Sequence, residues 1–113
     1  MKIINRQQFL QLPAGVLFTK FEPSCFDELR IKGDTIGADF HAVTIADAID
    51  ADGTSDLLDK IHRAEGGESL HMDFETVQRD GLFDEDQLFA VWEREDVEKL
   101  VGRLLDSLAK TYS

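Results

Sequence analysis

Gln87-Leu88-Phe89-Ala90-Val91-Trp92 is the strongest strand signal in the chain, because β-forming apolar residues follow one another almost without interruption. Shortly after it, aliphatic residues recur at three- and four-residue spacing; they are Val97, Leu100, Val101, Leu104, Leu105 and Leu108. This spacing predicts a long amphipathic C-terminal helix from Asp96 to about Lys110. The last part of the chain is therefore predicted to combine β and α structure.

The preceding segments alternate between the same two kinds of structure. Apolar or alternating runs predict strands at residues 16–21, 29–32, 40–45 and 70–74. A helix capped by Thr54 or Ser55 is predicted to run to about Ala64. Another, short helix is predicted over residues 6–11, with Asn5 as its cap.

This order of elements predicts an α+β fold. We expect a small antiparallel or mixed sheet of four to five strands, with three helices packed mainly on one face. A length of 113 residues suits one hydrophobic core, so residues 1–113 are expected to form a single globular domain. The hydrophobic share of 42% and the eight Phe residues favour a well-packed core.

Features of a membrane or secreted protein are not found in the sequence. The apolar runs are much shorter than the roughly 20 residues that cross a bilayer, and the N-terminal residues turn polar at once. A lone cysteine, Cys25, cannot form an internal disulfide. We therefore expect a cytoplasmic protein with no membrane partner.

The formal net charge of −11 comes from 23 acidic and 12 basic residues. Such a charge repels nucleic acid and attracts basic surfaces, so direct nucleic-acid binding is not expected. The acids gather in the middle of the chain, since residues 33–59 contain no Lys or Arg and residues 64–93 contain only Arg79. This distribution has two interpretations: solubility, or a surface for a basic partner.

Under the second interpretation the acidic residues form two blocks, one before and within the middle helix and one before the last strand. The residues predicted to bind the partner are Asp47, Asp50, Asp52, Asp56, Asp59, Asp80, Asp84, Glu85 and Asp86. The protein would then inhibit or redirect a basic protein through an anionic surface.

Motifs for catalysis or metal binding are not found. Residues 47–53 resemble a calcium loop, but Ala48 replaces its first ligand and Asp59 stands where Glu is usual. The three histidines are scattered and the single cysteine offers no zinc pattern. Because nucleophile elbows, phosphate-binding loops and dinucleotide fingerprints are also missing, we expect no enzyme activity, no metal site and no cofactor.

A second functional hypothesis concerns the cations. Arg30 and Lys32 alternate along one strand and, with Arg79, could line a pocket for a phosphate-bearing ligand such as a nucleotide. The simpler interpretation is that they form the solvated face of that strand.

Several stretches are similar to small uncharacterised proteins of tailed bacteriophages. They are Phe9-Leu10-Gln11-Leu12-Pro13-Ala14-Gly15, Phe21-Glu22-Pro23, Ile31-Lys32-Gly33-Asp34 and Arg79-Asp80-Gly81-Leu82-Phe83-Asp84-Glu85-Asp86-Gln87-Leu88-Phe89. The resemblance covers most of the chain and brings no functional residues with it. It implies a phage-encoded protein acting in the host cytoplasm.

For such an origin, three activities are open. The protein could occupy a host defence or nucleic-acid-binding protein, with carboxylates taking the place of DNA phosphates. It could sequester a nucleotide signal used in host immunity. It could also be an oligomeric structural or virion-associated protein.

Overall fold

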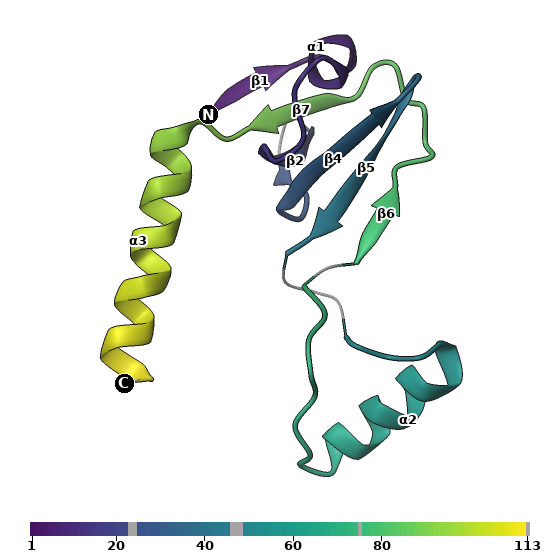
Figure 1. Cartoon of the computed structure of the whole chain (residues 1–113), viewed down its shortest axis with the longest axis vertical. Helices are drawn as coiled ribbons and strands as arrows, with labels where there is room; N and C mark the ends of the chain where they lie inside the picture. The colour runs from purple at the N-terminus through teal and green to yellow at the C-terminus, as the bar shows by residue number, and fades with distance from the viewer. Residues whose placement is uncertain (23–24, 46–48, 75, 113) are drawn as a thin grey trace.

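The computed structural model describes residues 1–22, 25–45, 49–74 and 76–112. Strands and helices follow one another along the chain as Figure 1 shows. The strands are β1 (Lys2–Ile4), β2 (Leu17–Glu22), β3 (Cys25–Phe26), β4 (Arg30–Ile36), β5 (Asp39–Thr44), β6 (Val77–Arg79) and β7 (Leu88–Val91). The helices are α1 (Arg6–Leu10), α2 (Thr54–Glu65) and α3 (Arg94–Thr111).

The strands form one antiparallel sheet in the order β1-β7-β2-β4-β5-β6, with β3 paired to β2. The predicted α+β class is confirmed, but the predicted number of four to five strands is wrong. The additional strands are short, and both β1 and β6 lie at the edges of the sheet. Two or three residues are too few to give a recognisable alternation.

Phenylalanine rings form the centre of the core, between α1 and one face of the sheet. The ring of Phe9, from α1, stacks on Phe89 of β7 with centroids 4.1 Å apart. It meets Phe18 and Phe40 edge-on, at centroid distances of 4.7 and 4.8 Å. All four rings are fully buried. Asn5 fixes the start of α1 through the predicted cap, because its side chain accepts from the Gln8 backbone N–H.

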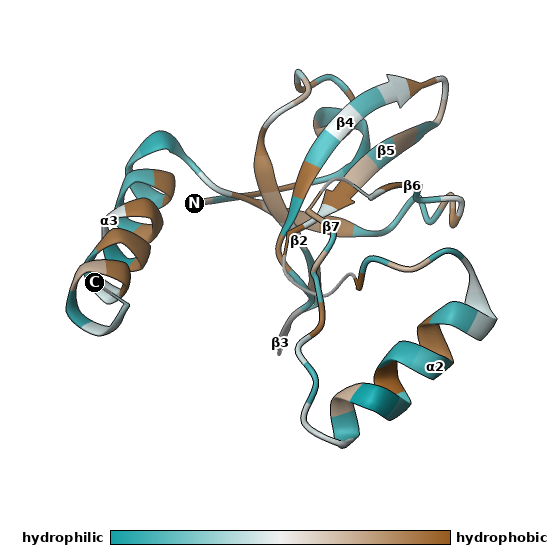
Figure 2. Cartoon of the chain, turned by 60° about the horizontal axis from the view of Figure 1, so that its bottom comes forward, coloured by the Kyte–Doolittle hydropathy of each residue, from teal (hydrophilic) through white to brown (hydrophobic). Residues whose placement is uncertain are grey.

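The other two helices do not cover the sheet, so the prediction of three helices packed mainly on one face is wrong. Neither α2 nor α3 contains a buried residue among those described. Both extend away from the sheet (Figure 1), and each carries apolar residues along its length (Figure 2). The radius of gyration is 16.5 Å, compared with about 13–14 Å for a compact domain of this length.

Two further predictions about local structure are wrong. Residues 70–74 do not form a strand; Met72 makes only an isolated bridge with Ile49, and the strand is β6, a few residues later. The residue before α2 is Gly53, at φ 115°, and it supplies no side-chain cap. As a separate observation, no helix in the described ranges is both long and apolar enough to span a bilayer.

Candidate functional site: a cavity beside α1 and the loop before β7

Five charged residues meet where α1 approaches the ends of β2, β5 and β6. The Arg6 guanidinium lies 3.2 Å from the Asp80 carboxylate and 3.7 Å from that of Asp39. Lys20 Nζ lies 2.6 Å from Asp80, and Arg79 Nε lies 2.5 Å from Asp39. Because Arg6 and both carboxylates are almost completely buried, each charge depends on these partners.

Asp39 accepts hydrogen bonds from several donors at once. Besides Arg79, the backbone N–H groups of Phe40 and Gly81 donate to it, at 2.9 and 3.1 Å. Burial would raise the pKa of Asp39, but these hydrogen bonds together outweigh it and hold the pKa below the ordinary value. The carboxylate is therefore ionised at neutral pH, and it fixes the turn that leaves β6.

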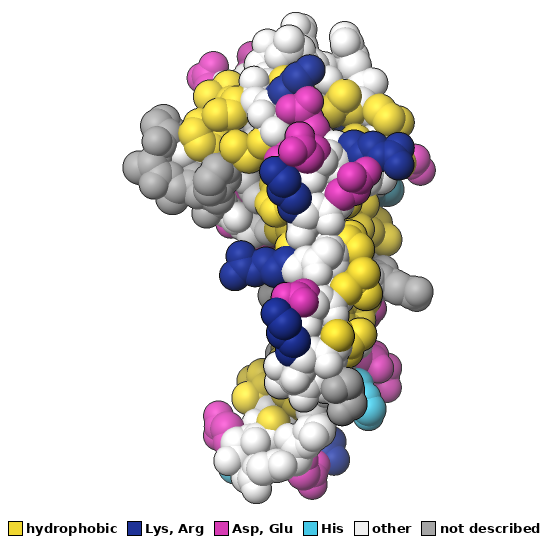
Figure 3. All heavy atoms as spheres, turned by 90° about the vertical axis from the view of Figure 1, so that its left-hand side faces the viewer, with side chains coloured by type: hydrophobic (Ala, Val, Ile, Leu, Met, Phe, Trp, Pro, Cys, Tyr) yellow, Lys and Arg dark blue, Asp and Glu magenta, His cyan; other side chains and the backbone are white. Residues whose placement is uncertain are grey.

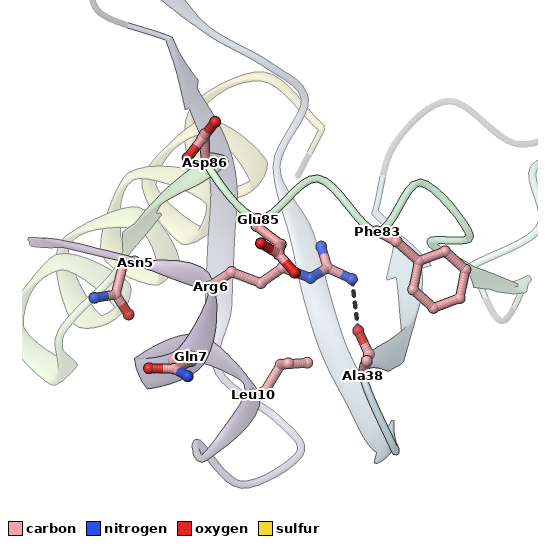
Figure 4. Close-up of a pocket in the computed structure, with 8 residues that line it drawn as sticks. All are labelled: Asn5, Arg6, Gln7, Leu10, Ala38, Phe83, Glu85 and Asp86. Atoms are coloured by element: carbon pink, nitrogen blue, oxygen red, sulfur yellow. Dashed lines mark hydrogen bonds between the residues drawn. The ribbon is translucent and has the colours of Figure 1, made fainter.

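A cavity of about 610 Å³ lies directly outside this cluster. It is lined by Asn5, Arg6, Gln7, Leu10, Ala38, Phe83, Glu85 and Asp86. Figure 4 shows Asn5 and Gln7 on one side and Phe83 with Ala38 on the other, with Arg6 and Glu85 between them. The Arg6 guanidinium is turned to the Ala38 carbonyl, to which it donates at 2.9 Å. The cavity thus has polar walls, an aromatic side and an acidic rim.

Phe83 has an unusual backbone conformation at this cavity. Its φ is +53°, and it is the one non-glycine residue with positive φ in the described part of the chain. A bulky side chain is uncommon in this left-handed region because Cβ crowds the following carbonyl, at a cost of roughly 1–2 kcal/mol. The ring is nevertheless 51% exposed. Burial of the ring therefore does not explain the conformation, and such strain is characteristic of functional sites.

The two acidic residues of the cavity differ from the other charged groups around it. Arg6 is already engaged by Asp39, Asp80 and a carbonyl oxygen. Within the described residues, no hydrogen bond or ion pair engages the carboxylates of Glu85 and Asp86, both of which are exposed. The free charge at the mouth of the cavity is therefore negative. The arrangement suits a cation with an apolar stem, which could lie against Phe83 and Leu10.

The second predicted acidic block is thus only partly at the surface. Asp80 does not belong to a partner-binding surface, because its side chain is 1% exposed and holds Arg6 and Lys20. Asp84 is exposed, and its carboxylate accepts a hydrogen bond from the Asp86 backbone N–H at 3.0 Å. This hydrogen bond holds the backbone of the loop. Glu85 and Asp86 line the cavity. The prediction placed all four in one group without distinguishing these roles.

The first predicted block lies elsewhere, on the excursion that carries α2 between β5 and β6. Asp56 pairs with Lys60 at 3.1 Å and Asp59 with Arg63 at 3.4 Å, so these charges are partly neutralised. Asp50 and Asp52 are exposed in the loop before the helix. Asp47 lies outside the described residues.

The two blocks do not form one surface. The α2 excursion joins the sheet at the start of β6, whereas the acidic loop leaves from the other end of that strand (Figure 1). The predicted anionic face is therefore two separate acidic regions.

The three cations of the nucleotide hypothesis are each engaged by other groups of the protein. Arg30 pairs with Glu28, and Arg79 pairs with Asp39. Lys32 is not part of a solvated face: it is 1% exposed, and its Nζ donates to Thr35 Oγ1 at 2.8 Å. Burial lowers the pKa of Lys32. None of the three lines the cavity described above.

Sequence reasoning did not find the α1 side of the site or Phe83. Asn5 was identified only as a helix cap, and the local sequence contains no sign that Gln7 and Leu10 would face the acidic loop. The conformation of Phe83 has no sequence signature either, since left-handed backbone is expected at Gly or Asn. One signal was available: Leu82 and Phe83 interrupt an acidic run, and aromatic residues are enriched at interfaces.

Among the described residues, no group of three or more His, Cys, Asp or Glu side chains is arranged to hold a metal ion. Comparisons of the chain with protein-family models, with curated proteins and with solved structures yield no match.

Proposed function

We propose that this chain is a non-enzymatic binding protein that captures a basic partner protein through the acidic loop before β7. In the bound state, a lysine or arginine side chain of the partner would enter the cavity beside α1. Its aliphatic stem would lie against Phe83 and Leu10, and its charge would meet Glu85 and Asp86.

One observation carries this proposal: the free carboxylates of Glu85 and Asp86 lie at a cavity beside a strained, exposed Phe83. Aromatic side chains at the centre of an interface commonly contribute most of the binding energy. The carboxylates would contribute mainly association rate and specificity, because the net charge of −11 attracts a basic surface from a distance.

The nature of the partner follows from the phage resemblance, which we retain as part of the proposal. A phage protein of this kind would inhibit or redirect a host protein with a basic groove, such as a defence or nucleic-acid-binding protein. The exposed acids of the α2 excursion, Asp50 and Asp52, would then add electrostatic attraction without forming the central contact.

The test compares three double variants with the same net charge. Glu85→Lys/Asp86→Lys changes the loop, Asp52→Lys/Asp59→Lys changes the α2 excursion, and Asp27→Lys/Asp34→Lys changes exposed acids outside both regions. Affinity capture from bacterial lysate is followed by quantitative mass spectrometry. We expect the loop variant to lose the captured protein, the α2 variant to retain part of it, and the third variant to retain most. Equal losses in all three would show that net charge alone attracts the partner, contradicting the proposed site.

A second variant separates binding from folding. Phe83→Gly removes the aromatic ring and relieves the left-handed strain, so the free energy of unfolding should stay level or rise by up to about 1 kcal/mol. Capture of the partner should nevertheless fall. If capture is unchanged while stability rises, Phe83 has no part in binding.

The nucleotide alternative is less well supported, because Arg30 and Arg79 are paired and Lys32 is buried. Thermal-shift measurements with nucleotides provide its test. A ligand at 100 times its dissociation constant adds about 2.7 kcal/mol of stability.

A further inference from the structure

A second cavity lies where α3 leaves the sheet. It has a volume of about 310 Å³ and is lined by Met1, Trp92, Asp96, Lys99, Leu100 and Arg103. The side chains of Trp92 and Leu100 are partly buried and give the cavity an apolar wall. This cavity shares no lining residue with the one beside α1, so the two can be tested independently.

The apolar wall includes Trp92, the single tryptophan of the chain. Within the part of the chain that the structure describes, no aromatic ring pairs with the indole and no cation lies over it. Its Nε1 likewise donates no hydrogen bond to a described residue. An indole stacks well on another flat ring, and its N–H is a donor. Trp92 therefore offers both groups to a ligand.

Arg103 adds a positive charge to the same cavity. It is exposed, and no ion pair or hydrogen bond engages its guanidinium among the described residues. Lys99 pairs with Glu95 at 3.1 Å, but both side chains are at least 75% exposed, so this pair is weak. The one acid of the cavity, Asp96, is paired with the Met1 amino group at 2.6 Å. In contrast to the cavity beside α1, the unpaired charge here is positive.

The surroundings of this cavity are more basic than the rest of the protein. Residues 99–112 carry three cations and one carboxylate, and Figure 3 shows Lys and Arg side chains along one side of α3, with apolar side chains along another. All four carboxylates of residues 93–98 have an ion-pair partner. An anion approaching the cavity therefore meets a locally favourable surface, although the net charge of the chain is −11.

We propose that this cavity binds a small organic anion that carries an aromatic ring. The ring stacks on Trp92 beside Leu100, and a carboxylate or phosphate of the ligand pairs with the Arg103 guanidinium, which recognises either acid through two parallel hydrogen bonds. A cavity of about 310 Å³ is at the lower end of the range for ligand pockets, so the ligand is small. The cations of the nucleotide hypothesis, Arg30, Lys32 and Arg79, have no part in this site.

The first experiment uses Trp92 as the reporter, because its fluorescence changes when a ring stacks on it. The full chain is titrated with benzoate, an aromatic carboxylate, and with adenosine monophosphate, an aromatic phosphate. Adenosine and inorganic phosphate each lack half of the required chemistry. We expect saturable quenching by an aromatic anion, with at least about 10-fold weaker binding of adenosine and inorganic phosphate.

The outcomes of this titration are distinct. Binding of benzoate alone would identify a carboxylate as the natural acid group, and binding of adenosine monophosphate alone would identify a phosphate. Saturation by neither aromatic anion would overturn the proposal. Adenosine or inorganic phosphate binding as tightly as the aromatic anion would overturn it too, since the ring and the acid would then not act together.

The second experiment tests Arg103 by substitution. Arg103→Gln should weaken binding of the aromatic anion by roughly 10- to 100-fold, because it removes a charge-assisted hydrogen-bonding partner. The matched control is Arg94→Gln, which changes an exposed arginine of the same helix that does not line the cavity. This control should bind normally, and circular dichroism should show that both variants remain folded. Unchanged affinity in Arg103→Gln, or equal losses in both variants, would contradict the assigned site. Capture of the basic partner should persist in Arg103→Gln, which distinguishes this site from the acidic loop.

Discussion

Apolar surface is buried to different extents in two regions of the molecule. One region is the sheet together with α1, and the other consists of the projecting helices α2 and α3. In the sheet, four phenylalanine rings meet at a single point and are fully covered. Helices α2 and α3 have clear apolar faces, yet neither buries a residue among those described. Amphipathic spacing thus establishes that a helix has a face to cover, but not that the same chain covers it. The free energy of folding should reside in the sheet and α1, and the projecting helices should contribute little.

The largest expected effect is in the phenylalanine cluster. Phe9→Ala should lower the free energy of unfolding by about 3–5 kcal/mol, because it removes the ring that contacts the other three. Leu58→Ala on α2 should change it by less than about 0.5 kcal/mol, since that side chain is exposed. Urea unfolding followed by tryptophan fluorescence measures both. Comparable losses would show that α2 belongs to the same cooperative unit.

The next effect concerns the buried charges. Asp39→Asn should cost about 2–3 kcal/mol, because Arg6 and Arg79 lose their ionic partner while Arg79 stays accessible to water. Replacing Asp52, an exposed acid on the α2 excursion, by Asn should cost almost nothing. Thermal unfolding at neutral pH compares the two variants.

Asp39 should also make the free energy of unfolding sensitive to acid. Its folded pKa lies below the ordinary value of 3.8, so its ionised form stabilises the protein fully above about that pH. This stabilisation is lost as the pH falls through the lower, folded pKa. Below about pH 3.8, the stability of Asp39→Asn should therefore change less with pH than that of the wild type. Identical pH dependence would show that the hydrogen bonds to Asp39 do not depend on its charge.

The contrast between the two regions also explains which features the sequence could predict. The cap at Asn5, the strands β2 and β7 and the helix α3 each have a strong local signal, and the structure contains all of them. Strand β6 has none, because all three of its residues are exposed. It forms through pairing with β5, which is a tertiary effect that overrides local preference.

The positions of two groups of residues that the sequence analysis named, Lys32 and the loop acids, depend on long-range contacts in the same way. Alternation placed Lys32 on a solvated face, but Lys32 lies opposite the buried Ala42 of β5, and its ammonium is 5.6 Å from the centroid of the Phe9 ring. The loop acids were found by composition alone, whereas their cavity requires α1, which lies more than 70 residues away in the chain. Sequence could indicate the charge of the site but not its shape.

A pair of identical substitutions sharpens the comparison. In β4, a Cβ added at Gly33 would lie 2.9 Å from His41 Cβ and 3.1 Å from the His41 carbonyl oxygen of the neighbouring strand. Gly33→Ala should therefore force the strands apart and destabilise the protein by about 1–3 kcal/mol. Chemical denaturation measures the loss. A stabilised variant would show that β4 and β5 can separate locally without cost.

The smallest effect has the opposite sign and lies in α3. A Cβ added at Gly102 meets nothing within 4 Å, and glycine in a helix interior is unfavourable by roughly 0.8–1.0 kcal/mol relative to alanine. Gly102→Ala should thus stabilise the helix locally. Because α3 contains no buried residue among those described, this gain should appear as slower amide exchange along α3 and leave exchange in the sheet unchanged. Slower exchange throughout the sheet would contradict the comparison, since it would mean that α3 and the phenylalanine core unfold together.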